Sequence, residues 1–445
     1  MDNMKNIHSP QQIFELFRQH RHICTDTRKI VPGAIFFALK GENHDANAFA
    51  REAIEKGCAC AVIDNPQYAG ERCFLVENCL ETLQKIAVLY RESLMIPVIG
   101  VTGTNGKTTT KELLRSVLST RFKTYATQGN LNNHIGVPLS ILSIPSDTEM
   151  AIIEMGANHP GEIAELCKIA LPTYGLITNI GKGHLEGFGS FENIVHTKTA
   201  LYDFLRKVKG KAFVCADNPL LMELSQGLER FCYGEKNDVF LQMTPLENGK
   251  PCLECCLHGS VSSPALSEIS TQLIGAYNLE NVAGAACAGR YFGLSDHEIV
   301  AGIAAYTPTN LRSQSIRIGN NLLIADTYNA NPTSMAAAIN NFGKMQLAQT
   351  KTVILGDMLE LGDASQEEHQ QVIELLKQHN IPQAYLIGGC FGKTEHPSEY
   401  RRFAKTEDLL AYLETHPLEN RSVLLKGSHG IHLEKVIDFL QQAKR

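Results

Sequence analysis

The segment VIGVTGTNGKTTTKELLRSVL, residues 98–118, constrains the fold of this chain more than any other stretch. It begins with the pattern of a buried strand, continues through a turn rich in glycine and threonine, and ends with leucine and valine at helical spacing. A strand, a glycine-rich turn and a helix in this order predict an α/β layer in which the turn binds phosphate. The apolar positions of the predicted helix are Leu113, Leu114, Val117 and Leu118.

Each residue type in this turn suits phosphate binding. Gly103 and Gly106 allow the backbone to approach anionic oxygens, Lys107 supplies a positive charge, and the Thr108 hydroxyl can bind magnesium. The usual GxxxxGK[ST] spacing is not met, because Val101 stands where the first glycine belongs. The alternative is a glycine-rich turn without a ligand. The predicted nucleotide contacts are Gly103, Thr104, Asn105, Gly106, Lys107, Thr108 and Thr109.

The length and charge of the chain bound its class. A chain of 445 residues exceeds a single hydrophobic core and predicts two to four domains, of which we expect three. The net charge of -6, with both signs interspersed, offers no basic stripe for nucleic acid. The first residues lack the pattern of an export signal, and no run of eighteen apolar residues occurs. We therefore expect a soluble, cytoplasmic monomer without a membrane span.

Alternating strand and helix patterns predict an α/β fold in three parts. Residues 1–82 form a small α/β unit, and residues 83–308 carry the phosphate loop on a largely parallel sheet. Residues 309–445 repeat the alternation through LLIAD, TVILGD, QAYLIGG and SVLLKG, which predicts a doubly wound, Rossmann-like domain. Catalysis is then expected in the clefts between the three parts.

Thirteen cysteines are scattered through apolar contexts, which indicates reduced, buried thiols rather than a disulfide framework. The one cluster, PCLECC, contains Cys252, Cys255 and Cys256. A zinc site there needs a second ligand pair, and His258 follows too closely for a finger or ribbon. We expect alternating strand residues, with zinc binding as the alternative.

Polar residues at strand ends predict a crevice beside the phosphate loop. Glu154 ends the apolar run of IIEMGANHPGEI, His184 lies in TNIGKGHLEGFGS, and Asn132 and Asn133 lie in TQGNLNNHIGVPLS. A carboxylate in a buried strand requires compensation, which a nucleotide-bound magnesium ion would supply. The alternatives are a Glu154 paired with a surface lysine and a His184 that is solvated or hydrogen-bonded. Lys198, in VHTKTALYDFL, is by itself an exposed helix lysine.

Several of these motifs together resemble the Mur family of amide-bond-forming ligases. TGTNGKTTT is similar to the family's variant phosphate loop, and GHLEGFGS followed by VHTKTALYDFL is similar to its second magnesium segment. The resemblance implies a three-domain architecture, ATP and two magnesium ions. It places Thr108 and Glu154 at one ion, and His184 and a carbamylated Lys198 at the other. Lys107, Glu154, His184 and Lys198 are thus the expected catalytic residues.

The resemblance also implies contacts for the nucleotide and the substrates. The segment GAYNLENVAGAACA implies that Asn278 contacts adenine, and Arg312 is expected near the phosphates. TDTRKIVPGAIFFALKG is similar to the uridine-nucleotide-binding first domain, although Thr27 replaces the usual serine and HDANAF departs from the usual HDGHxF. LLKGSHGIHLE has His429 where the family has arginine, so no role is assigned to it. The resemblance further implies nucleotide contacts at Asp326 and Tyr328. The implied substrate contacts are Thr27, Arg28, Asn132, Asn133, Asn329, Asn331 and Lys426.

Within the family, YNANPTSM and NLNNHIGVPLS favour the branch that adds D-alanyl-D-alanine to UDP-N-acetylmuramoyl-tripeptide. The implied reaction phosphorylates the tripeptide carboxylate and lets the incoming amine displace phosphate. The alternatives are the ligase that adds the third amino acid, the more distant folylpolyglutamate synthetase, and a regulator that binds nucleotide without catalysis.

Overall fold

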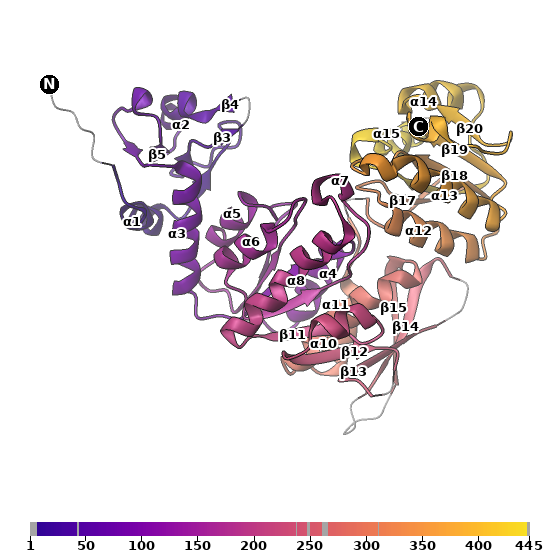
Figure 1. The fold of residues 1–445 in the computed structure, drawn as a ribbon, viewed down its shortest axis with the longest axis horizontal. Helices are drawn as coiled ribbons and strands as arrows, with labels where there is room; N and C mark the ends of the chain where they lie inside the picture. Colours follow the sequence, from indigo (N-terminus) through magenta and orange to yellow (C-terminus); the bar gives the residue numbers. More distant parts are fainter. Residues whose placement is uncertain are drawn as a thin grey trace.

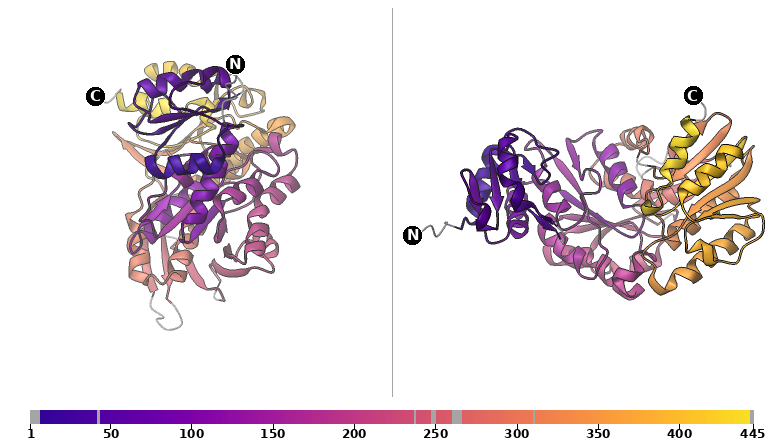
Figure 2. Two further views of the ribbon diagram at one scale, coloured as in Figure 1. Left: turned by 90° about the vertical axis from the view of Figure 1, so that its left-hand side faces the viewer. Right: turned by 90° about the horizontal axis from the view of Figure 1, so that it is seen from above.

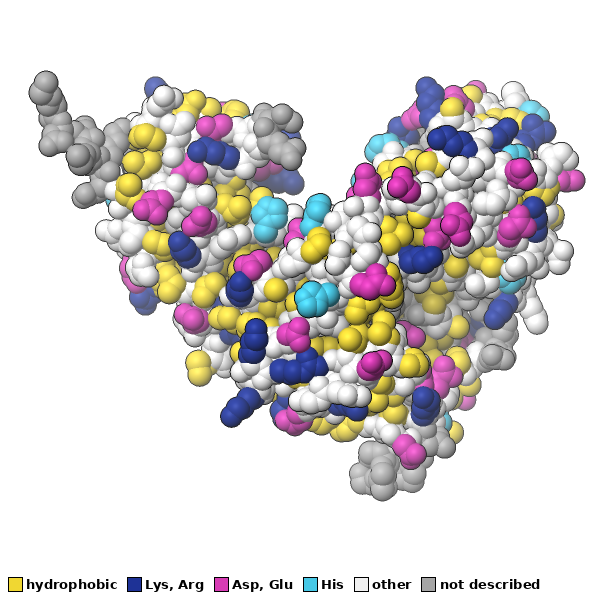
Figure 3. Space-filling view, in the orientation of Figure 1, with side chains coloured by type: hydrophobic (Ala, Val, Ile, Leu, Met, Phe, Trp, Pro, Cys, Tyr) yellow, Lys and Arg dark blue, Asp and Glu magenta, His cyan; other side chains and the backbone are white. Residues whose placement is uncertain are grey.

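The computed structural model consists of three α/β units in a row and describes residues 7–41, 44–236, 238–246, 250–259, 266–309 and 311–442. The first and third units stand on opposite sides of the central unit (Figures 1 and 2). In the space-filling view the surface is deeply hollowed between these two units (Figure 3). The α/β class and the three-unit architecture predicted from the sequence are confirmed.

The first unit is built on a four-stranded parallel sheet of order β1-β2-β5-β6. Its central strands β2 and β5 are buried, and α2 packs against both of them. Helix α1 packs against α3, which continues toward the next unit. The strands are β1 (Ile23–Cys24), β2 (Ile35–Phe37), β3 (Lys40–Gly41), β4 (His44–Asp45), β5 (Cys60–Ile63) and β6 (Cys73–Leu75), and the helices are α1 (Pro10–His20), α2 (Ala50–Glu55) and α3 (Cys79–Ser93), with short 3-10 turns at Ala46–Phe49 and Pro66–Tyr68.

Helix α3 joins the first unit to the central one. Tyr90 donates its hydroxyl to the Ile144 carbonyl at 2.6 Å, and the buried Arg91 donates to the carbonyls of Ala170 and Leu171 at 3.1 and 3.0 Å. One continuous apolar core runs through both units. The first unit is therefore attached by packing as well as by the chain.

The central unit has a nine-stranded sheet of order β15-β14-β13-β12-β11-β10-β7-β9-β8. The strands from β8 to β13 pair in parallel, and β14 and β15 add an antiparallel edge. The prediction of a largely parallel sheet is confirmed. The strands are β7 (Val98–Thr102), β8 (Thr124–Ala126), β9 (Met150–Glu154), β10 (Tyr174–Ile177), β11 (Lys211–Cys215), β12 (Glu229–Gly234), β13 (Leu241–Pro245), β14 (Cys252–His258) and β15 (Leu266–Ile274). The helices are α4 (Lys107–Leu118), α5 (Gly136–Leu142), α6 (Glu162–Ala170), α7 (Leu185–Phe188), α8 (Phe191–Val208), α9 (Pro219–Leu224), α10 (Leu279–Tyr291) and α11 (Asp296–Ala305), with a 3-10 turn at Ala276–Asn278.

The third unit has a six-stranded sheet of order β16-β17-β21-β18-β19-β20, parallel except for β16. Alternate residues of its strands enter two separate cores, one under α12 and α13 and one under α14 and α15, so the sheet is doubly wound as predicted. Its strands are β16 (Gln314–Ile318), β17 (Asn321–Asp326), β18 (Thr350–Gly356), β19 (Gln383–Ile387), β20 (Arg401–Phe403) and β21 (Arg421–Lys426). Its helices are α12 (Pro332–Lys344), α13 (Ser365–Gln378), α14 (Thr406–Thr415) and α15 (Glu434–Gln442), with 3-10 turns at Gly362–Ala364, Phe391–Lys393 and His429–Ile431.

The cysteines of the chain form no disulfide framework in the structure. All thirteen cysteines are free thiols, and most are buried. Cys252, Cys255 and Cys256 lie along β14, so this segment is a strand as expected. Among the described residues, no helix is both long and apolar enough to cross a lipid bilayer. The domain limits 1–82, 83–308 and 309–445 stay a prediction.

Candidate active site

The phosphate loop connects the end of β7 to the start of α4, as the sequence predicted. Gly103 has φ +144°, and a Cβ there would lie 2.0 Å from the Thr178 hydroxyl. Gly106 has φ +78°, and its Cβ would lie 2.5 Å from Oδ1 of Asn281. Left-handed backbone and close neighbours together require glycine at both positions. The amides at the start of α4 remain available to an anion.

Lys107 lies half-buried over this loop. Its Nζ donates to the carbonyls of Gly103 and Thr104, each at 2.9 Å. Burial lowers the pKa of Lys107 to about 8, partly opposed by Glu154 and reinforced by Arg312. Without a bound anion, the ammonium group is therefore held by two backbone oxygens in an unfavourable environment.

Glu154 ends β9 with only 1% of its surface exposed. Its Oε1 accepts hydrogen bonds from Thr108 at 3.3 Å and Asn132 at 2.8 Å, while the buried Oε2 has no hydrogen-bond partner in the described part of the chain. The lysine beside it, Lys111, is itself fully buried, with Nζ 3.9 Å from Oε2. The alternative of a pair with a surface lysine is therefore wrong. A buried carboxylate oxygen without a partner, beside a threonine hydroxyl, fits a hard divalent cation.

The exposure of Lys198 differs from what its sequence context alone suggests. It lies on α8 but is only 2% exposed, so the description as an exposed helix lysine is wrong. Its Nζ donates to the Ala157 carbonyl at 3.4 Å and lies 5.5 Å from the centre of the Phe188 ring. Burial lowers the pKa of Lys198 well below its usual value, with Lys107 adding to this and Glu162 opposing it. A lowered pKa increases the neutral fraction of the amine, which is the form that can react with carbon dioxide to give a carbamate.

His184 adopts a left-handed backbone with φ +53° immediately before α7. Its Nδ1 is hydrogen-bonded to Glu360, which belongs to the third unit. Burial lowers the pKa of His184, while Glu360 opposes that shift and Lys107 and Lys198 add to it. The histidine is thus hydrogen-bonded, as one alternative expected, but its partner is a carboxylate from across the unit boundary.

The third unit contributes a second group of predicted residues. The Arg312 guanidinium lies 3.7 Å from the centre of the Tyr328 ring, and its buried Nε has no hydrogen-bond partner among the residues that the structure describes. Lys426 is buried and donates to Asp326 at 2.5 Å and to the Asn329 carbonyl at 3.0 Å. Because Arg312 acts on the pKa of Lys107, this group lies within electrostatic reach of the phosphate loop.

Direct contacts hold the third unit against the phosphate loop. Asn331 Nδ2 donates to Asn105 Oδ1 at 2.8 Å, and Asn105 Nδ2 donates in return at 3.4 Å. Lys182 pairs with the buried Glu368 at 2.7 Å. Asn331 therefore contacts the loop itself in this arrangement, in addition to capping α12.

Asn278 lies close to the start of α4 but has its side chain engaged. It donates to the Ile274 carbonyl at 2.8 Å and accepts from Asn281 at 2.9 Å. Asn281 in turn accepts the Thr110 hydroxyl at 3.0 Å. These bonds make Asn278 part of the frame behind the loop.

Thr27 and Arg28 are not brought to the phosphate loop, because they lie in the first unit. Arg28 is exposed and pairs with Asp26 at 2.8 Å. A groove of about 990 Å³ lies between the first and central units, and Asn133 is on its wall. Other lining residues are Gln11, Gln84, His134 and Glu162. The groove leads from α3 toward the loops that follow β8 and β9.

Sequence reasoning missed several residues that shape the site. Lys111 lies beside Glu154, Asn281 binds Thr110 in the first turn of α4, and Glu360 binds His184 from a distant segment. Lys111 did leave a signal, because it falls on the face of α4 that carries Leu114 and Leu118. Glu360 left none, since its partner is 176 residues away in the chain.

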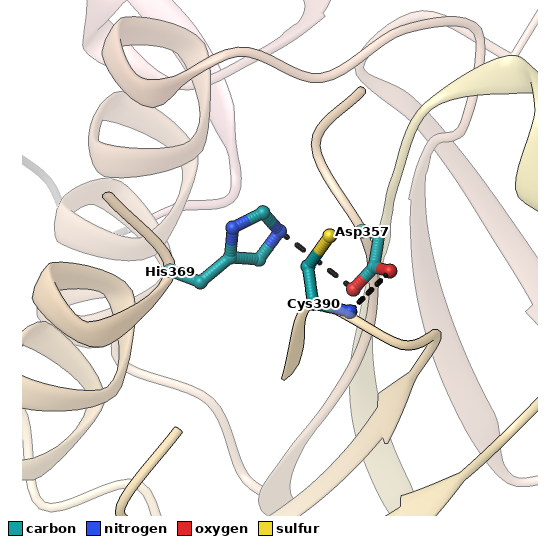
Figure 4. A group of neighbouring side chains, drawn as sticks. All are labelled: Asp357, His369 and Cys390. Carbon is teal, nitrogen blue, oxygen red and sulfur yellow. Dashed lines mark hydrogen bonds and ion pairs between the residues drawn. The ribbon is translucent and has the colours of Figure 1, made fainter. Parts of the chain in front are cut away.

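Among the described residues, Asp357, His369 and Cys390 are close enough to bind one metal ion (Figure 4). The Asp357 carboxylate and the His369 ring are already hydrogen-bonded to the protein, however. The Asp357 carboxylate accepts the backbone amides of Cys390 and Phe391 at 2.8 and 2.9 Å. The Nε2 atom of His369 accepts the Met358 amide at 3.0 Å. We assign this group to the support of the loops after β18 and β19.

Comparison with known families agrees with this geometry. Residues 101–289 match the family described as Mur ligase middle domain, and residues 311–429 match the Mur ligase, glutamate ligase domain. The two matches cover the phosphate loop, Glu154, His184 and Lys198 in one and the doubly wound unit in the other.

Full-length relatives extend the match to the first unit. The chain is 34% identical to the UDP-N-acetylmuramoyl-tripeptide--D-alanyl-D-alanine ligase of Bacillus subtilis strain 168, covering 93% of this chain and 92% of the relative. It is 32% identical to the enzyme of the same name from Escherichia coli K12, covering 94% and 93%.

Solved structures give the same likeness. A crystal structure of MurF from Acinetobacter baumannii superposes with a TM-score of 0.86 at 29% identity, covering 98% of this chain and 99% of the other. MurF ligase from Thermotoga maritima, in complex with ADP, gives 0.84 at 27% identity over 95% and 97%. A folylpolyglutamate synthase from Mycobacterium tuberculosis shares the fold alone, with a TM-score of 0.63 at 13% identity over 81% and 94%.

Proposed function

The chain belongs to the Mur ligase family, and from this premise we propose that it uses ATP to join D-alanyl-D-alanine to UDP-N-acetylmuramoyl-tripeptide. The observation that supports this reaction over others of the family is the similarity, over all three units, to relatives named UDP-N-acetylmuramoyl-tripeptide--D-alanyl-D-alanine ligase. The product would be the UDP-linked pentapeptide precursor of peptidoglycan, made in the cytoplasm.

The nucleotide phosphates would bind the loop from Gly103 to Thr109. Lys107, now held by two carbonyls, would turn to the phosphate oxygens, and the Arg312 guanidinium would add charge from the third unit. Asp326 and Tyr328 would line the nucleotide site from the same unit, and Asn278 would lie near adenine. A positive, preorganised site of this kind supports phosphoryl transfer by positioning and charge neutralisation.

Two magnesium ions fit the residues present. Thr108 and the free oxygen of Glu154 would hold one, and His184 with a carbamylated Lys198 the other. Bound magnesium supplies charge neutralisation at the transferring phosphoryl group. Carbamylation by carbon dioxide, with release of a proton, would convert the Lys198 amine into an anion, which replaces repulsion from Lys107 by attraction. His184 would exchange Glu360 for the cation.

The reaction would have two steps. The terminal carboxylate of the tripeptide attacks the γ-phosphorus of ATP, which forms an acyl phosphate and releases ADP. The amine of D-alanyl-D-alanine then attacks the acyl carbon, loses a proton, and expels inorganic phosphate as the amide forms. Lys107 would stabilise the charge on the transferring group, and closure of the third unit would exclude water.

We assign residues 1–82 to the UDP-linked substrate, 83–308 to ATP and 309–445 to closure over both. Thr27 and Arg28 would contact the uridine nucleotide, and the groove beside Asn132 and Asn133 would carry the peptide toward Glu154. The last substrate contacts would come from Asn329, Asn331 and Lys426. Because one chain supplies all of these residues, we propose that the protein acts as a monomer.

Phosphate release tests this proposal. Purified protein receives ATP, magnesium, UDP-N-acetylmuramoyl-tripeptide and D-alanyl-D-alanine, with each component omitted in turn, and the product is identified by mass spectrometry. Release that needs all four, with a UDP-linked pentapeptide product, is the expected result. Release with a UDP-linked dipeptide and a single amino acid would instead assign the preceding ligase, and no release with either set would favour a nucleotide-binding regulator.

A further inference from the structure

Lys111 is a buried lysine that the proposed reaction does not use. It lies on α4 one turn after Lys107 and has 0% of its surface exposed. Its Nζ donates to the Thr127 carbonyl at 2.7 Å and pairs with Glu112 at 2.9 Å. A charge so fully removed from water is costly unless it is compensated nearby. The groups around Lys111 therefore indicate the function of its positive charge.

The neighbour that matters for the site is Glu154. Its Oε1 accepts hydrogen bonds from Thr108 and Asn132, and its Oε2, which has no hydrogen-bond partner among the described residues, lies 3.9 Å from Lys111 Nζ. This distance is longer than a hydrogen bond but short for two opposite charges screened by little water. Lys111 thus acts on Glu154 through its charge, and it leaves the oxygen free for another ligand.

The backbone links the same residues. Thr127 donates its amide to the Ile152 carbonyl at 3.0 Å, and its hydroxyl accepts the Glu154 amide at 3.0 Å. Lys111 binds the remaining carbonyl of Thr127. The ammonium group is therefore fixed relative to Glu154 and cannot turn away when the site changes its occupant.

We propose that Lys111 is a positioning residue whose fixed charge keeps the affinity of the nucleotide-free site for divalent cations low, so that the cation binds together with the nucleotide. This inference rests on the proposed function. A cation entering beside Glu154 meets a positive charge that already offsets the carboxylate. The phosphates of a nucleotide supply the missing negative charge, and the balance then favours the cation.

The charge of Glu112 also affects the cation affinity of the site, because Glu112 pairs with Lys111. Burial raises the pKa of the Glu112 carboxyl, but the hydrogen bonds from Lys111 and Arg115 outweigh burial, and the net pKa is lowered. Glu112 is therefore an anion shared between Lys111 and the exposed Arg115. Loss of its charge would leave Lys111 uncompensated and more repulsive to a cation at Glu154.

The test is a titration of the full-length protein with Mn²⁺, in which electron paramagnetic resonance reports the free ion, first without nucleotide and then with ADP. Lys111→Met should bind Mn²⁺ roughly tenfold more tightly than wild type without nucleotide. Glu112→Gln should bind Mn²⁺ at least about threefold more weakly than wild type does. Arg115→Met removes a positive charge from the same helix, from a side chain that also contacts Glu112. It should stay near wild type, because the Arg115 side chain is half exposed and water and salt screen its charge.

The signs of these changes decide the outcome. A merely structural lysine would lower Mn²⁺ affinity on removal, so unchanged or weaker binding by Lys111→Met overturns the inference. If Lys111→Met does not fold, tighter or unchanged binding by Glu112→Gln overturns it instead. Failure of the wild type to bind Mn²⁺ even with ADP would overturn the phosphate-loop assignment and the inference together. Mn²⁺ binding without ligase turnover would leave the inference standing and reject only the proposed substrates.

Discussion

Replacing Lys107 by methionine should abolish turnover and also stabilise the nucleotide-free protein. A lysine whose pKa falls from 10.5 to about 8 loses about 3 kcal/mol in the stability of its charged form. Water at the half-buried side chain reduces this, and the Gly103 and Thr104 carbonyls lose a donor on substitution. We therefore expect a net stabilisation of about 1–2 kcal/mol at pH 7.

The pH dependence separates this cause from better packing of methionine. Because the unfolded chain binds the Lys107 proton more tightly than the folded protein does, the penalty is complete below about pH 8 and disappears as the pH rises to 10.5. Thermal unfolding of both proteins without nucleotide at pH 7 and pH 10 measures it. Lys123→Met removes an exposed lysine of the same unit and should show no such change. A less stable Lys107→Met protein, or an advantage that persists at pH 10, would refute the reasoning.

Three further predictions follow from single features of the structure. Gly106→Ala should weaken ADP binding at least tenfold by calorimetry, because its Cβ would meet Asn281, whereas Gly227→Ala, with the same φ of +78° and open space, should bind ADP normally. Burial lowers the pKa of His369, so the folded protein favours the neutral ring and should lose stability as the pH falls below about 6.5; thermal unfolding between pH 7 and 5 should show a smaller loss for His369→Gln. Burial raises the pKa of the Cys167 thiol to about 12, so iodoacetamide at pH 7.5 should label it only after denaturation, as mass spectrometry will show; labelling of the native thiol contradicts its burial.

Local sequence determined much of the fold. The strand, loop and helix around Gly103 and Gly106 follow from short-range patterns, because glycine conformation, apolar periodicity and a helix start are all local properties. The apolar runs of the third unit likewise predicted a sheet covered on both faces, and its residues do alternate between two cores. The resemblance of several motifs to those of a known family then identified the side chains at the strand ends as candidate site residues.

Only the tertiary structure decided the environment of those side chains. Lys198 has the spacing of an ordinary helix lysine, yet packing against other elements buries it and lowers its pKa. Glu360 reaches His184 from 176 residues away, and no local pattern encodes that contact. Burial and charge at a site are sums over neighbours brought together by the whole fold, whereas periodicity and turn chemistry are properties of a few consecutive residues. The sequence therefore determined which chemical groups are present, and the packing of three units decided which of them are buried, paired or left free to bind.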